Sequence, residues 1–134
     1  MSILIWDEKY CVGIGEFDRQ HQKFFMLVNH LYDAVERNDG KELIERKLKG
    51  IEEFYNHHFF SEEKYMEAFS YPDFEFHRKV HRSFIENADK HMAEYNKSGK
   101  VPHEFLEYLR DWWTEHILKT DKRYQSFFNS RGLL

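Results

Sequence analysis

Apolar residues recur at intervals of three and four along most of the chain, a pattern typical of helices that bury one face. Asn38-Asp39-Gly40 and Ser98-Gly99 are stop signals that interrupt this pattern. Proline is favoured in the first turn of a helix, where Pro72 and Pro102 would stand. We therefore expect helices over residues 17–37, 41–69, 72–96 and 102–129, preceded by an arm of about residues 1–16.

No part of the sequence alternates apolar and polar residues as a half-buried strand would, and no internal repeat or low-complexity segment is found. The expected connections are short, so neighbouring helices must run antiparallel. The pattern predicts an all-α fold, an up-down-up-down four-helix bundle with an N-terminal arm, as a single domain over residues 1–134.

Composition removes several classes of function. The 134 residues have a formal net charge of -4 and no dense cluster of Lys and Arg between aromatic residues, so nucleic acid is not an expected partner. Apolar runs are far shorter than the roughly 18 residues that span a membrane, and Asp7 comes too early for a secretory signal. Cys11 is the single cysteine, which excludes an internal disulfide. We expect a cytoplasmic protein, and a monomer.

Polar residues interrupt the apolar stripes of all four predicted helices. In the second helix, His58 and Glu62 stand between Phe54 and Tyr65 at helical spacing. Buried ionisable groups are costly without a partner, so several of them on core faces need a common explanation. Seven such residues have side chains that bind metals: His21, His58, Glu62, His77, His81, His116 and Asp121.

The seven residues are predicted to lie at one level of the bundle. His21, His77 and His81 come soon after the starts of their helices. Glu62 and Asp121 come about two turns before the ends of theirs, and these ends lie beside those starts in an antiparallel bundle. With a rise of about 1.5 Å per residue, all seven could fall within a slab on the order of 10 Å thick. Five imidazoles and two carboxylates form a nearly complete ligand set for two transition-metal ions.

The number of ligands predicts an unequal pair of metals. If Glu62 and Asp121 each bridge two metals, they supply four bonds, and five imidazoles bring the total to nine. Two octahedral ions need about twelve bonds. A bridging hydroxide or oxide would add two and leave one vacant position, on the metal with two histidines, where a small ligand such as dioxygen could bind. Zinc or manganese would also accept these ligand types.

At these residues the sequence resembles the hemerythrin family, in particular the single-domain bacteriohemerythrins. The resemblance covers essentially the whole chain and includes Trp6 and Gly13 in the arm. The combined pattern H…HxxxE…HxxxH…HxxxxD is highly specific, although each fragment alone is weak. The matching segments are DRQH at 18–21, HFFSEE at 58–63, HRKVH at 77–81 and WTEHILKTD at 113–121.

The resemblance implies a non-haem di-iron centre that binds dioxygen reversibly, for oxygen carriage, storage or delivery. The ligand roles that it implies are His77, His81 and His116 on the coordinatively saturated iron, His21 and His58 on the iron with the open position, and Glu62 and Asp121 as bridges beside a hydroxide or oxide.

The ligand types favour an oxygen-binding protein over an enzyme. Carboxylate-rich di-iron proteins use two Glu-x-x-His motifs, and this chain has no such pair. An oxygen or redox sensor that acts through a signalling partner is the main alternative, and a di-iron oxidase is the next. A carrier would deliver its oxygen to an oxygen-consuming enzyme.

Four apolar residues are spaced to face the site from three helices, and they could form a dry oxygen pocket. Ordinary core packing explains such aromatic stripes equally well. The four are Phe24, Phe59, Trp113 and Ile117.

His116 and Asp121 are five residues apart, which places them about 140° apart around a regular helix. They can converge only if their side chains reach inward from two flanks of the helix or if a π-bulge widens the turn. Such bulges are common at functional sites, so we predict an irregularity between the two residues. The other polar residues nearby are assigned ordinary roles: Asp18 as a helix-start acid, Glu63 as a solvated charge, and His30, His57, His91 and His103 as surface or bundle-edge residues.

Overall fold

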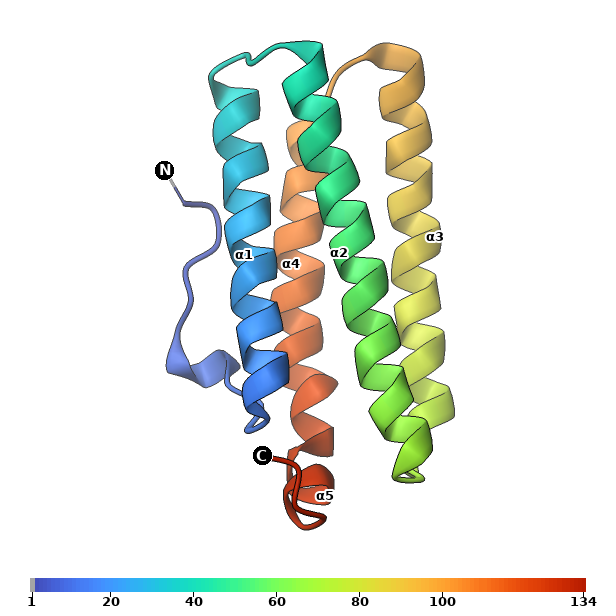
Figure 1. Ribbon diagram of the computed structural model, residues 1–134. Coiled ribbons are helices and arrows are strands. Elements are labelled where there is room, and N and C mark those ends of the chain that lie inside the picture. Colours follow the sequence, from blue (N-terminus) through green and yellow to red (C-terminus); the bar gives the residue numbers. More distant parts are fainter. Residues whose placement is uncertain (1) are drawn as a thin grey trace.

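The computed structural model describes residues 2–134, and every regular element in that range is helical. Four of these elements are long helices. They lie side by side, and each runs opposite to the one before it (Figure 1). The predicted all-α four-helix bundle is thus confirmed. The elements are η1 (Glu8–Tyr10), α1 (Gly15–Glu36), α2 (Lys41–Ala68), α3 (Phe74–Ser98), α4 (His103–Lys119), η2 (Asp121–Tyr124) and α5 (Gln125–Asn129).

The turns lie where the stop signals predicted them, but both prolines stand just before their helices. Pro102 is the N-cap of α4, which begins at His103. Pro72 was expected in the first turn of α3, but the helix begins at Phe74. Ser70 takes a left-handed φ of 57° after α2, and the backbone N–H of Tyr71 bonds back to the carbonyl of Met66 at 2.8 Å. This turn occupies the residues up to Asp73, so Pro72 belongs to the connection and not to the helix.

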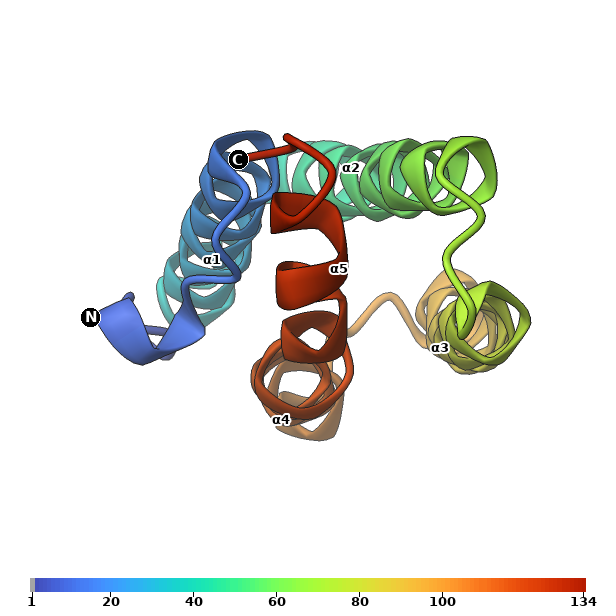
Figure 2. The ribbon, with the colours of Figure 1, turned by 90° about the horizontal axis from the view of Figure 1, so that it is seen from below.

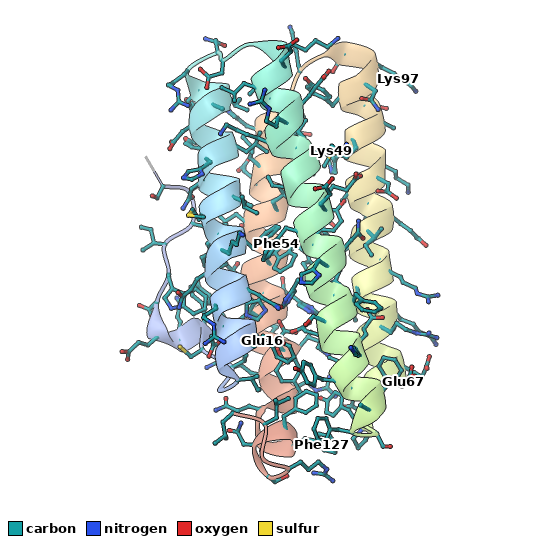
Figure 3. All side chains as sticks on the ribbon, in the orientation of Figure 1. Glu16, Lys49, Phe54, Glu67, Lys97 and Phe127 are labelled. Carbon is teal, nitrogen blue, oxygen red and sulfur yellow. The ribbon has the colours of Figure 1, made fainter. Side chains whose placement is uncertain are left out.

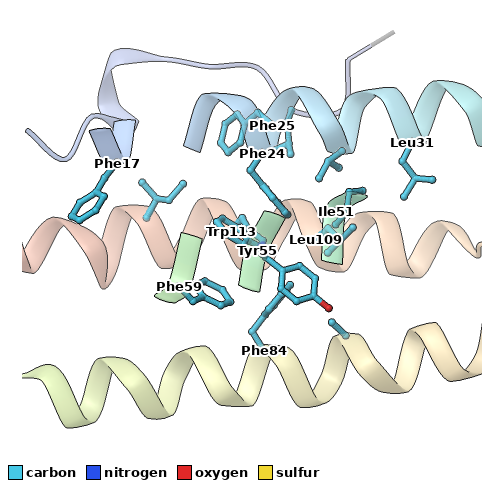
Figure 4. Packing of buried hydrophobic residues seen from close by; sticks show 14 of the residues in the cluster. Phe17, Phe24, Phe25, Leu31, Ile51, Tyr55, Phe59, Phe84, Leu109 and Trp113 are labelled. Atoms are coloured by element: carbon cyan, nitrogen blue, oxygen red, sulfur yellow. The ribbon is translucent and has the colours of Figure 1, made fainter. Parts of the chain in front are cut away.

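The core consists of the inward apolar stripes of the four helices. Ring contacts join neighbouring helices. Phe24 of α1 stacks on Trp113 of α4 with ring centroids 3.8 Å apart, and Tyr55 of α2 meets Phe84 of α3 edge-on at 5.0 Å. Figure 4 shows these rings gathered between the helices. Within residues 2–134, none of the helices is both long and apolar enough to pass through a membrane.

The N-terminal arm is held against α1 by side chains of that helix. Asn29 Oδ1 accepts hydrogen bonds from the backbone N–H groups of Ile3 and Leu4, and Asn29 Nδ2 donates to the carbonyl of Leu4 at 2.8 Å. Asp18, in the first turn of α1 as expected, accepts the backbone N–H of Val12 at 2.7 Å. Charged side chains fringe the outside of the bundle, for example Lys49, Glu67 and Lys97 (Figure 3).

Gly50, in the interior of α2, is expected to be a site where alanine stabilises the protein. A Cβ atom added there would meet no other atom within 4 Å. Glycine inside a helix costs roughly 0.5–1 kcal/mol relative to alanine, because its backbone loses more freedom on folding. Gly50→Ala should therefore raise the free energy of unfolding by about this amount, measured by urea denaturation.

Gly13→Ala provides a control of opposite sign. Gly13 has a φ of +77°, and a Cβ atom there would lie 2.4 Å from Nε2 of Gln125. This substitution should lower the free energy of unfolding. Equal effects of the two variants would contradict the helix-propensity argument for Gly50.

Candidate metal centre

The structure brings all seven predicted residues into one buried cluster inside the bundle. Each long helix supplies at least one of them, and Asp121 is the first residue of η2. None is more than 3% exposed to solvent. Their donor atoms form two groups, each with all its atoms within 4.8 Å of one another. One group is His77, His81, His116, Glu62 and Asp121, and the other is His21, His58, Glu62 and Asp121.

Both carboxylates belong to both groups, and each divides its two oxygens between them. Asp121 Oδ1 lies 2.9 Å from Nε2 of His116 and 3.0 Å from Nε2 of His77. Its Oδ2 faces the other group, 3.2 Å from Nε2 of His21.

Glu62 follows the same arrangement. Its Oε1 lies 3.3 Å from Nε2 of His81, and its Oε2 lies 3.4 Å from Nε2 of His58. A carboxylate that presents one oxygen to each of two histidine groups has the form of a bridging ligand.

The nitrogen and oxygen atoms of the cluster are arranged to bind metal cations rather than to hydrogen-bond with one another. Within each group, pairs of imidazole nitrogens face each other: Nε2 of His21 lies 3.0 Å from Nε2 of His58, and Nε2 of His81 lies 3.2 Å from that of His116. Both oxygens of Asp121 and Oε1 of Glu62 are buried without a well-directed hydrogen bond. Buried acceptors normally have a partner, and one metal ion in each group would satisfy them together.

The electrostatics of the site support the same interpretation. Burial acts to raise the pKa values of Glu62 and Asp121, and repulsion from Asp121 acts to raise that of Glu62 further, yet the surrounding histidines hold both pKa values well below the usual range. Burial lowers the pKa of His116 to about 4. Burial also acts to lower the pKa of His81, but hydrogen bonds to Glu62 and Glu63 outweigh it and raise that pKa to about 9. Two ionised carboxylates thus share a dry interior, which is costly without cations.

Asp121 reaches the cluster because the chain bends after α4. The N–H of Thr120 still bonds to the carbonyl of His116 at 2.8 Å, but the N–H of Arg123 bonds to Thr120 at 3.2 Å, which is the tighter 3₁₀ pattern. The predicted irregularity is present, whereas the predicted π-bulge is wrong. Figure 2 shows the chain leaving the axis of α4 and crossing the end of the bundle toward α1 and α2. This change of direction turns Asp121 inward.

The four residues predicted to line a pocket are all buried, at 2% exposure or less. Phe59 stacks on the His81 ring at 4.0 Å and on Trp113 at 5.3 Å. Trp113 lies 5.6 Å from the His58 ring, centroid to centroid, and also stacks on Phe24. Aromatic surface therefore adjoins both histidine groups. Ile117 belongs to the same buried core on α4.

Comparison with known proteins decides the family. Residues 12–128 match the family model described as the hemerythrin HHE cation binding domain. The chain belongs to the hemerythrin family. It is 29% identical to a bacteriohemerythrin of Methylococcus capsulatus over 92% of this chain and 95% of the relative. It is 30% identical to a myohemerythrin of Theromyzon tessulatum over 90% of this chain and 89% of that one.

A solved wild-type hemerythrin structure superimposes with a TM-score of 0.86 at 26% identity, covering 93% of this chain and 97% of that one. The resemblance drawn from the HxxxE, HxxxH and HxxxxD segments is therefore confirmed.

Three polar residues beside the centre of this hemerythrin were not recognised as part of it. His58 Nδ1–H donates to Oε1 of Gln20 at 2.5 Å, and His81 Nδ1–H donates to Oε2 of Glu63 at 2.8 Å. These bonds turn both Nε2 atoms toward the cluster. The prediction that Glu63 is a solvated charge was wrong. Tyr124 is fully buried, and its hydroxyl donates to Oε2 of Glu62 at 2.6 Å.

The sequence held a weak signal for these residues, because Gln20 and Glu63 lie next to predicted ligands. Which neighbour of a ligand contacts the centre depends on how the helices face each other. The remaining histidines lie apart from the cluster, as predicted: His30, His57 and His103 are exposed, and His91 is half-buried against the ring of Phe105.

Proposed function

We propose that this hemerythrin binds dioxygen reversibly at a di-iron centre and serves in oxygen carriage, storage or delivery. One observation carries the proposal: two groups of histidines share two carboxylates, and each carboxylate directs one oxygen to each group. Two iron ions held there would supply a redox-active coordination site for dioxygen. We assign one iron to His77, His81 and His116 and the other to His21 and His58, with Glu62 and Asp121 as bridges beside a hydroxide or oxide.

The unequal number of histidines supports a binding role. The group with two imidazoles has one ligand fewer, and this is where a small ligand would find room. The carboxylates of Glu62 and Asp121 balance the charge of two cations in an otherwise apolar interior. Tyr124 stabilises the orientation of Glu62 through its hydrogen bond to Oε2.

The surrounding residues have a protective role in this proposal. Phe24, Phe59, Trp113 and Ile117 exclude water from the two-histidine side and provide no acid or base for a reaction. We therefore propose a binding protein and not an enzyme. Because one chain supplies all seven ligands, the centre needs no second subunit, in keeping with the expected cytoplasmic monomer.

The test is a cycle of anaerobic loading with ferrous iron, addition of oxygen and removal of oxygen, followed by optical spectroscopy. We expect two irons per chain and an absorption band that appears with oxygen and disappears without it. Another iron stoichiometry, or the absence of a reversible band, would exclude the carrier. Rapid irreversible turnover with release of hydrogen peroxide would indicate an oxidase.

His58→Ala should weaken or abolish oxygen binding, because it removes one of only two imidazoles from the group with the open position. The exposed neighbour His57 offers a matched control, since His57→Ala makes the same change one residue away without touching the cluster. Oxygen titrations of both loaded variants test the assignment. Unchanged oxygen affinity in His58→Ala would contradict it.

A further inference from the structure

The hydrogen-bond partners of two ligand histidines on the two sides of the centre differ in charge. His81, in the three-histidine group, donates its outer Nδ1–H to the carboxylate of Glu63 at 2.8 Å. His58, in the two-histidine group, donates its outer Nδ1–H to the neutral amide oxygen of Gln20 at 2.5 Å. The two bonds play the same geometric part, because each turns an Nε2 atom toward the cluster, but only one of them places a negative charge behind its ligand.

In the described part of the chain, no other ligand histidine has such a hydrogen bond. Among residues 2–134, Glu63 is the one carboxylate hydrogen-bonded to the outer nitrogen of a ligand histidine. The outer nitrogens of His21 and His116 are buried without a hydrogen-bond partner. Within the described chain, the ion pair of Glu63 is with His81, even though Lys64 and Arg78 line the same groove.

Both partners reach from the surface of the protein to a ligand. Glu63 lines a groove of about 510 Å³ between α2 and α3, and its side chain is 24% exposed. Gln20 lines a second groove of about 470 Å³ between α1 and α2. The exposed ring of Phe60 borders both. Because each partner is only half-buried, its charge can be changed without placing a new unpaired charge in the core.

A carboxylate behind an imidazole makes that imidazole a stronger electron donor, and a more basic ligand stabilises the higher oxidation state of its metal. We propose that Glu63 and Gln20 together determine which iron is oxidised first. Glu63 makes the three-histidine iron the more easily oxidised, while the neutral Gln20 leaves the two-histidine iron ferrous. When one electron passes to an oxidant such as ferricyanide, the three-histidine iron becomes ferric and the open position stays on ferrous iron. This inference rests on the proposed di-iron function.

The chain itself provides the conservative substitutions for a test. Glu63→Gln keeps an oxygen that can accept the Nδ1–H of His81, just as Gln20 accepts that of His58. Gln20→Glu makes the reverse change, and the double variant exchanges the two partners. Each variant changes the charge at position 63 or 20 but keeps an acceptor for the Nδ1–H of the histidine. If these residues only held the rings in place, the reduction potentials of the irons would not change.

The experiment is an anaerobic titration with ferricyanide of protein that holds two irons per chain, with electron paramagnetic resonance detecting the one-electron-oxidised centre. Glu63→Gln should raise the reduction potential of the iron that is oxidised first. The expected change is about tenfold in its ferrous-to-ferric equilibrium, which corresponds to about 59 mV for one electron. Glu67→Gln, an exposed change on the same helix, should leave this potential unaltered.

Azide then identifies the ferric iron, since this anion binds ferric iron more tightly than ferrous iron and can enter only at an open position. We expect the double variant, once oxidised by one electron, to bind azide at least tenfold more tightly than the wild type does. A Glu63→Gln potential equal to that of the wild type, or equal azide affinities, would overturn the inference alone. Failure of the wild type to take up two irons would instead overturn the proposed function.

Discussion

Glu62→Gln is expected to leave this hemerythrin unable to hold two irons. Glu62 is fully buried and directs Oε1 toward His81 and Oε2 toward His58, so its two oxygens serve both histidine groups. Glutamine offers a single neutral oxygen and an N–H₂ group that cannot bind a cation. The affinity for the second iron should fall by more than the roughly 10–100-fold that loss of an outer partner costs.

Iron per chain after anaerobic loading and desalting tests this result, with circular dichroism as the check on folding. Glu67→Gln makes the same chemical change five residues further along α2, at an exposed position. It should retain two irons. If Glu62→Gln also retained two, Glu62 would not be a bridge, and the assignment of both groups would have to change.

Trp113→Ala should have the largest effect on stability. The indole of Trp113 is fully buried, stacks on Phe24 at 3.8 Å and on Phe59 at 5.3 Å, and so meets side chains of all three other long helices, with Phe84 of α3 as the third. Replacing a buried tryptophan with alanine typically costs about 3–5 kcal/mol, through lost apolar burial and the cavity left behind. We expect a loss of this size in the free energy of unfolding of the metal-free protein, measured by urea denaturation.

Trp113→Phe separates packing from the indole N–H. That N–H is buried without a hydrogen-bond partner, so replacing it with a ring that keeps the stack on Phe24 should cost much less than alanine does. A loss below about 1 kcal/mol for Trp113→Ala would contradict the view that this residue holds the four helices together beside the centre.

The inward positions of the seven candidate ligands were predictable because helical phase is a local property. His58 and Glu62, or His77 and His81, are four residues apart and must share a face on any regular helix. The short connections then determine which helix ends lie together, which places the residues at one level. These steps need no knowledge of how two helices are rotated against each other.

The form of the bend at Asp121 was not predictable in the same way. Spacing alone indicated that His116 and Asp121 could converge only from two flanks of a regular helix or through an irregularity, and an irregularity is present. The expected solution was a wider turn within one continuous helix. Instead α4 ends, and a 3₁₀ turn carries the chain across the end of the bundle. Which solution occurs depends on the packing of Phe128 of α5 against Phe17 of α1 and Phe69 after α2, and these contacts exist only in the folded bundle.

By itself, the sequence determined the four long helices, their inward faces and the level at which five histidines and two carboxylates meet. It could do so because helix periodicity and short connections restrict the chain before any tertiary contact forms. Only the tertiary structure decided how Asp121 approaches the centre and that Gln20, Glu63 and Tyr124 support its ligands. These contacts cross between helices, so they depend on how far one helix is displaced along its neighbour and how it is rotated about its own axis. A movement of a few ångströms between the partner atoms would break every one of these hydrogen bonds.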